Sequence, residues 1–89
     1  MIVVSSEDSA EADSVARRLG HAAPKVDGMA VFGPAPAPLA MLRGRHRQRL
    51  LVHASRSLDV QDVIRDWLAG VEWTAKVRVS VDVDPYSFL

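Results

Sequence analysis

The stretch that decides the fold is GPAPAPLAMLRGRHRQRL, residues 33–50. Successive N–H groups of an extended chain point to opposite edges, so the alternating prolines Pro34, Pro36 and Pro38 delete hydrogen-bond donors along one edge only. A strand of this kind pairs on its other side alone. We therefore predict an edge strand over residues 29–39, blunted against further pairing. A polyproline linker or SH3-domain ligand is less favoured, because the spacing is P-x-P-x-P rather than P-x-x-P.

Three further strands are indicated on either side of this segment. Arg43-Gly44 is expected to turn the chain into a basic strand that continues through residues 50–54. Residues 2–4 form a short β-branched run, and the valines of residues 77–83 alternate with polar residues. That period of two predicts a half-buried strand.

Two helices are predicted between the strands. Apolar residues at helical spacing run from Ala12 to Leu19 and from Val60 to Val71. Capping oxygens precede the first helix at Ser5, Ser6, Asp8 and Ser9, and Ser57 precedes the second. The expected stops are Gly20 and Gly70.

The resulting order is strand-helix-strand-strand-helix-strand in a single domain of 89 residues. This order favours an α+β class fold, a ferredoxin-like βαββαβ sandwich with an antiparallel sheet and two helices on one face. The second and fourth strands are then expected at the edges, and the other face of the sheet has no helix to cover it.

Charge is distributed unevenly although the net charge is zero. Residues 28–58 contain no Asp or Glu but hold five of the nine arginines, so the positive potential is local. The chain has no cysteine, no apolar run of transmembrane length and no signal-peptide pattern at its start. We therefore expect a cytoplasmic protein without a membrane segment.

Arg45, Arg47 and Arg49 share one face of the basic strand, with His46 and Gln48 on the other. Guanidinium groups about 7 Å apart repel one another unless an anion lies across them, and the phosphates of a nucleic-acid backbone fit that need. A solvated strand face is the alternative. Base readout of the RNA-recognition type is less favoured, because none of the five aromatic residues (Phe32, Trp67, Trp73, Tyr86 and Phe88) lies in this strand.

Other chemistry has weaker support. Asp82 and Asp84 lack an evident third metal ligand, and the three histidines have no metal-binding context, so we expect no metal site. No nucleophile elbow or P-loop is present, and we expect no catalytic residue. Arg56, directly before the second helix, is expected either to form a compact anion pocket with the free N–H groups of that helix or to be an ordinary surface arginine.

Three segments carry a family resemblance. They are GPAPAPLAMLRGRHRQRLLV (residues 33–52), SRSLDVQDVIRDWL (residues 55–68) and KVRVSVDVDPYSFL (residues 76–89). Together they resemble the C-terminal domain of the PriA family of replication-restart helicases (primosomal protein N′). The first thirty or so residues fit that domain by pattern only. Relatives often carry aromatic residues in place of His46 and Gln48, which argues against stacking on DNA at those two positions.

The resemblance implies that the chain is the C-terminal part of a longer protein, with a start at Met1 that is not native and a natural end at Leu89. It also implies a fold similar to that of a ribosomal small-subunit protein. The ATP-dependent superfamily 2 motor, which uses Mg²⁺, and the zinc-binding insertion of such helicases would lie outside this region. We therefore expect no cofactor here and no enzymatic activity of this chain alone.

Two functions are consistent with the residues and the resemblance. The first is an accessory module that binds the phosphate backbone of branched or single-stranded fork DNA, weakly and with strong salt dependence when alone. Its expected contacts are Arg43, Arg45, Arg47, Arg49, Lys76 and Arg78. The second is a docking module that receives the acidic tail of single-stranded-DNA-binding protein, with Arg56 as the expected contact, or that braces the remaining helicase domains.

Overall fold

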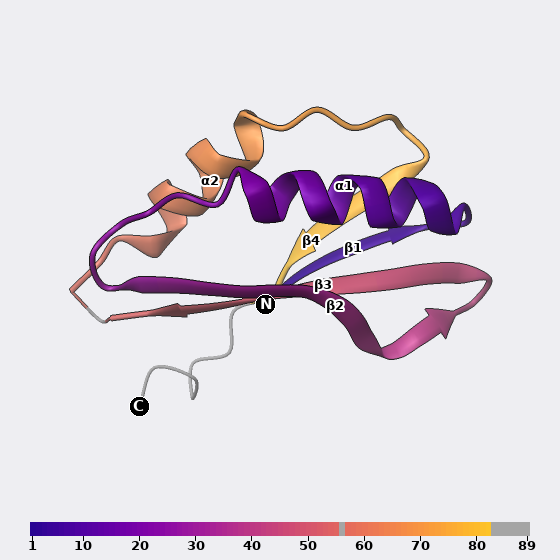
Figure 1. Ribbon diagram of the computed structural model, residues 1–89, viewed down its shortest axis with the longest axis horizontal. Coiled ribbons are helices and arrows are strands. Elements are labelled where there is room, and N and C mark those ends of the chain that lie inside the picture. Colours follow the sequence, from indigo (N-terminus) through magenta and orange to yellow (C-terminus); the bar gives the residue numbers. More distant parts are fainter. Residues whose placement is uncertain (56, 83–89) are drawn as a thin grey trace.

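The computed structural model describes residues 1–55 and 57–82. Its elements are β1 (Ile2–Ser6), α1 (Ser9–His21), β2 (Met29–Leu42), β3 (Arg45–Ala54), α2 (Val60–Ala69) and β4 (Val77–Val81). The strands form one antiparallel sheet in the order β2-β3-β1-β4. Both helices lie on the same side of it (Figure 1). The predicted ferredoxin-like α+β sandwich, with the second and fourth strands at the edges, is confirmed.

The strand register assigns each residue to a face. Ile2 lies opposite Leu50 on β3 and opposite Val81 on β4, and Val4 lies opposite Gln48 and Val79. Ile2, Val4 and Leu50 are fully buried and belong to one core with Val15, Ala16 and Leu19 of α1. Every second residue along each strand, counted from these buried positions, therefore belongs to the helix-covered face. The intervening positions form the opposite face, which we call the open face.

Helix α1 begins where the sequence predicts. The Asp8 carboxylate accepts hydrogen bonds from the N–H groups of Ala10 and Glu11, at 2.9 and 3.4 Å, and so caps two of the unpaired donors. The helix continues one residue past the expected stop at Gly20 and ends at His21. The Trp67 indole of α2 donates to the carbonyl of Leu19 at 3.0 Å, which joins the end of α1 to the second helix.

The predicted cap of α2 is wrong. Asp59, not Ser57, occupies the N-cap position, and it makes no side-chain capping bond. The Ser57 hydroxyl lies 3.0 Å from that of Ser55, so its hydrogen bond is made within the preceding loop instead. The predicted stop is correct, because Gly70 is the C-cap residue.

Strand β2 is an edge strand, as the alternating prolines indicate, but its pairing with β3 breaks twice. The first register shift lies between Phe32 and Ala35 and the second between Pro36 and Met41. At the second shift β2 leaves the regular ladder over Ala37–Ala40, a segment that we call the arch. Within it Ala37 is buried, whereas Leu39 is 67% exposed and has a positive φ of 44°. The Arg43-Gly44 turn then leads into β3 as predicted.

Candidate nucleic-acid interface

The sheet carries no acidic residue. None of the four strands, within the bounds that the structure gives them, contains an Asp or Glu. The acids described lie in helices and connecting segments. This separation follows from the fold, because the acid-free part of the sequence forms both β2 and β3, the two longest strands.

Four arginines lie on the open face. Arg45, Arg47 and Arg49 occupy alternate positions of β3, so successive members are about 7 Å apart along the strand. Arg78 of β4 lies opposite Ser5, which itself lies opposite Arg47, so Arg78 and Arg47 flank β1 in one row across the sheet. We call these four residues the arginine cluster. On β1, the small or apolar side chains of Val3 and Ser5 lie between the three β3 arginines and Arg78.

Arg45 is tied to the protein backbone. Its Nη2 donates to the Ser5 carbonyl at 2.9 Å and lies 3.4 Å from the Lys76 carbonyl, and its Nε donates to the Ser5 hydroxyl at 3.3 Å. The guanidinium therefore links the end of β1 to the residue before β4. It remains positively charged, but part of its donor capacity serves the fold.

Arg47 reaches in the opposite direction. Its Nη1 donates to the Leu39 carbonyl at 3.1 Å, in the arch of β2. A guanidinium has five N–H donors, so one bond of this kind leaves donors for a phosphate. Arg45 and Arg47 are thus fixed in place by backbone acceptors on opposite sides of β3.

Arg49 and Arg78 have no such attachment in the part of the chain that the structure describes. Arg49 is half-buried between Ala35 of β2 and Val3 of β1, and Arg78 is exposed on the edge strand. Across residues 1–55 and 57–82, no ion pair involves any member of the arginine cluster. Cations without an ion-pair partner among the described residues form the kind of surface that attracts a phosphate chain.

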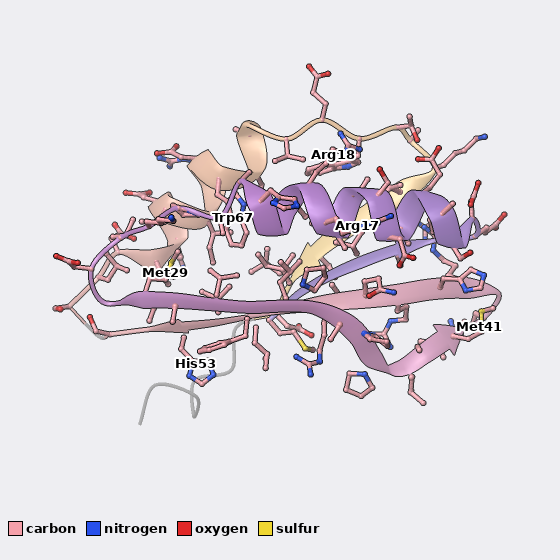
Figure 2. The ribbon with its side chains drawn as sticks, in the orientation of Figure 1. Arg17, Arg18, Met29, Met41, His53 and Trp67 are labelled. Carbon is pink, nitrogen blue, oxygen red and sulfur yellow. The ribbon has the colours of Figure 1, made fainter. Side chains whose placement is uncertain are left out.

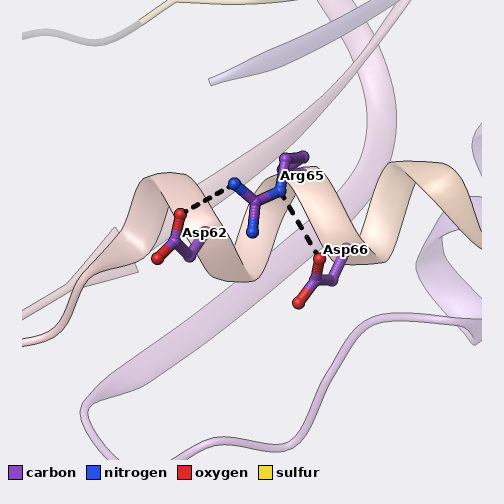
Figure 3. A network of polar contacts seen from close by, with 3 residues as sticks. All are labelled: Asp62, Arg65 and Asp66. Carbon is purple, nitrogen blue, oxygen red and sulfur yellow. Dashed lines mark ion pairs between the residues drawn. The ribbon is translucent and has the colours of Figure 1, made fainter.

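A helix arginine shows the contrast. Arg65 on the exposed side of α2 pairs with Asp62 at 3.1 Å and approaches Asp66 at 3.6 Å (Figure 3). Each helix carries both signs of charge, with Glu11, Asp13, Arg17 and Arg18 on α1. The two sides of the molecule therefore differ in electrostatic character, and the open face is the cationic one.

A depression of about 460 Å³ adjoins the cluster at the end of β1. It is lined by Ser6, Glu7, Asp8, Arg45, Ala75, Lys76 and Arg78. Three of these residues are cationic and were predicted from the sequence as nucleic-acid contacts. Glu7 and Asp8 offset part of their charge, and the Asp8 carboxylate is already engaged as the cap of α1. The depression extends the positive surface past the ends of these strands without forming a separate cationic pocket.

Comparison with known protein families identifies the family of this chain. A family model described as primosomal protein N C-terminal domain (PriA_C) matches residues 1–86. The chain belongs to the PriA C-terminal domain family. The match includes the first thirty residues, which from sequence fitted the domain only by pattern.

The curated relatives are longer proteins that are also named PriA. The chain is 28% identical over 87 residues to a replication restart protein PriA of Rickettsia conorii, covering 98% of this chain and 13% of that protein. It is 32% identical over 62 residues to the PriA of Haemophilus influenzae, covering 68% of this chain and 8% of that protein. The PriA C-terminal domain described here thus spans a small fraction of these relatives.

The remaining predicted positions fall in different places. Arg43 is exposed in the β2–β3 turn, beyond the end of the arginine cluster, and Arg56 lies outside the described residues. His46 and Gln48 lie opposite Ser6 and Val4, on the helix-covered face. Aromatic side chains at these two positions would therefore point away from the arginine cluster, so the absence of stacking groups there does not affect the open face.

The described residues bear on two further points, metal ligands and membrane-spanning helices. Residues 1–55 and 57–82 contain no group of three or more His, Asp or Glu side chains placed to hold a metal ion. Asp84, one half of the weak Asp-x-Asp motif, lies outside that range. In the same residues no helix is long and apolar enough to cross a membrane.

Proposed function

We propose that this PriA C-terminal domain is an accessory DNA-binding module that contacts the phosphate backbone of branched or single-stranded DNA during replication restart. The observation that carries the proposal is the sheet that lacks any acid and presents four arginines on its open face. Phosphate contacts position a nucleic acid without reading its sequence. The family name supports the setting, since the relatives are called replication restart proteins.

The geometry fits a backbone track more than a compact pocket. The three β3 arginines follow one strand, and Arg78 widens the track across β1. Arg45 and Arg47 are held by carbonyl acceptors, so part of their conformational entropy is already lost before DNA binds. Such preorganisation favours a defined path for the phosphates over a diffuse counterion cloud.

The test is a binding titration of the chain against labelled forked and single-stranded DNA at several salt concentrations. Three to five phosphate contacts predict affinity that falls steeply with salt, with a slope of log K against log [salt] of about −3. Absence of binding even at low salt would overturn the proposal. Binding with a slope near zero would also overturn it, because phosphate contacts release counterions.

A second candidate function is protein docking, and the exposed end of the β2–β3 hairpin favours it. Leu39, Met41 and Leu42 are 67%, 54% and 42% exposed beside Arg43. An apolar tip with an adjacent cation is suited to bracing a neighbouring domain of a longer PriA protein. Amide exchange at this tip, compared between the chain alone and a longer PriA protein, should show protection only in the latter.

The acidic tail of single-stranded-DNA-binding protein is a further candidate ligand of the docking function. Arg56 stays the predicted contact. Binding of a labelled acidic C-terminal peptide should be lost in Arg56→Glu and retained in Arg65→Glu. Equal binding to both variants would remove Arg56 from the proposal.

A further inference from the structure

Two rings lie together on the open face. Phe32 of β2 and His53 of β3 have ring centroids 5.5 Å apart and planes at 77°, an edge-to-face contact. The register explains it, since Phe32 lies opposite Leu51 and Ala30 opposite His53, so that the rings meet diagonally across the two strands. Figure 2 shows His53 on the side of the sheet away from the helices.

The pair does not belong to the core. Neither ring is part of the hydrophobic cluster that the helices form with the sheet, and Phe32 is 54% exposed and His53 is exposed. A single exposed apolar residue is ordinary on protein surfaces. A phenyl ring held edge-to-face by a second ring is different, because the contact fixes its orientation while leaving ring surface accessible to solvent.

The ring pair continues the arginine cluster. Along the open face of β3 the order is Arg45, Arg47, Arg49, Leu51 and His53. Phe32 lies beside Leu51, so it is one step of about 7 Å along the strand from Arg49. On β2, Ala35 lies opposite Arg49, and only Gly33 and Pro34 separate Ala35 from Phe32. Strand β2 therefore places no long side chain between the Phe32 ring and the Arg49 guanidinium.

We propose that the Phe32–His53 pair stacks an unpaired base of single-stranded DNA whose phosphates lie along the arginine cluster. The inference rests on the proposed DNA-binding function and specifies its ligand. Aromatic rings beside a cationic track are the combination with which proteins bind single strands without sequence preference. Bases inside a duplex are stacked on one another, so this site favours a single-stranded segment, such as an arm or gap of a fork.

The charge of the surroundings favours a nucleic acid over a protein segment at this place. No strand residue near the rings is acidic, and Arg49 is the nearest long side chain along β3 beyond Leu51. A partner here must supply both a flat apolar group and negative charge at a spacing of about one strand step. A nucleotide supplies both within one unit.

The experiment compares two labelled ligands of equal length and charge, oligo(dT) and the same backbone with abasic sites. The unaltered chain should bind oligo(dT) about tenfold more tightly, the advantage of roughly one stacked base. Phe32→Leu, which keeps an apolar side chain but removes the ring, should abolish that advantage and leave binding to the abasic strand unchanged. Phe32→Tyr should retain the advantage. Met41→Leu, at the exposed hairpin end, is the matched control and should behave as the unaltered chain.

The outcomes separate this inference from the function on which it rests. Equal affinity for the two ligands, with salt-dependent binding of both, would overturn the stacking site and leave the arginine cluster intact. A base-dependent advantage that survives in Phe32→Leu would place stacking elsewhere and overturn the assignment. If the unaltered chain binds neither ligand, the DNA-binding proposal is contradicted, and the stacking site with it.

Discussion

Arg47 donates a hydrogen bond to the carbonyl of Leu39 at 3.1 Å, and so connects the cationic row of β3 to the arch of the proline-rich edge strand. Arg45, two residues earlier, reaches the other way to Ser5 on β1. Arg45 and Arg47 lie on the same face of β3 but therefore bond to different strands of the sheet. Arg49 and Arg78 have no corresponding backbone bond among the described residues, which makes them the better probes of DNA binding.

Arg49→Gln should weaken binding to single-stranded DNA without unfolding the chain. Removal of one phosphate contact should lower affinity about fivefold and reduce the salt slope by about one. The melting temperature should stay the same, because Arg49 makes no hydrogen bond or ion pair with another described residue. Arg65→Gln on α2 is the matched control, and an equal loss of affinity in that variant would indicate a non-specific charge effect.

Arg45→Gln should destabilise the fold in addition to weakening DNA binding. It removes the guanidinium that bonds to the Ser5 carbonyl at 2.9 Å. The loss is about 1 kcal/mol, which lowers the melting temperature of a domain this small by about 4–8 °C. Arg78→Gln, on the exposed edge strand, serves as the control, because Arg78 makes no hydrogen bond or ion pair with another described residue. A melting temperature for Arg45→Gln that matches Arg78→Gln would contradict the structural role of Arg45.

Gly33→Ala should be the more damaging of two glycine substitutions. Gly33 has φ of +115°, and a Cβ atom there would lie 2.8 Å from the Arg49 carbonyl oxygen, a backbone atom that cannot move aside. Gly44 has φ of +77° with nothing within 4 Å of its Cβ position. Gly44→Ala should cost about 1 kcal/mol from backbone strain alone, and Gly33→Ala clearly more. Denaturant unfolding of both variants measures the difference, and equal losses would show that the approach of β2 to β3 is looser than described.

Trp67→Phe should weaken the junction between the two helices. The indole N–H bonds to the Leu19 carbonyl in a buried setting, and Trp67 is 5% exposed. Phenylalanine preserves much of the apolar contact but leaves the carbonyl without this donor, at a cost of about 1–2 kcal/mol. Thermal unfolding with an unchanged midpoint would mean that another donor replaces the indole.

The periodic elements were predictable because their patterns are local. Alternating valines placed β4, and apolar residues at helical spacing placed α1 and α2. The alternation of Arg45, Arg47 and Arg49 with His46 and Gln48 gave their opposite faces correctly. Each of these inferences depends on strand or helix geometry alone.

The rest depends on contacts between distant segments. The Arg45 and Arg47 bonds to Ser5 and Leu39 arise from side-chain directions that no sequence pattern specifies. The break in β2 pairing is set by how the arch fits over β3. Ser57 does not cap α2, because the helix begins at Val60 and Asp59 occupies the N-cap position. Phe32 and His53 belong to different strands, so only the register reveals that they meet.

The central claim is that the open face binds the phosphate backbone of DNA. The most direct test is to measure forked-DNA binding over a salt series for two double charge reversals with the same net charge. Arg49→Glu with Arg78→Glu alters the open face, and Arg17→Glu with Arg65→Glu alters the helices, with folding of each checked by thermal melting. We predict that the DNA affinity of the open-face variant falls by more than about tenfold. The helix variant should keep a slope of log K against log [salt] of about −3, as in the unaltered chain. Equal losses in the two variants, or tight binding by the open-face variant, would contradict the claim.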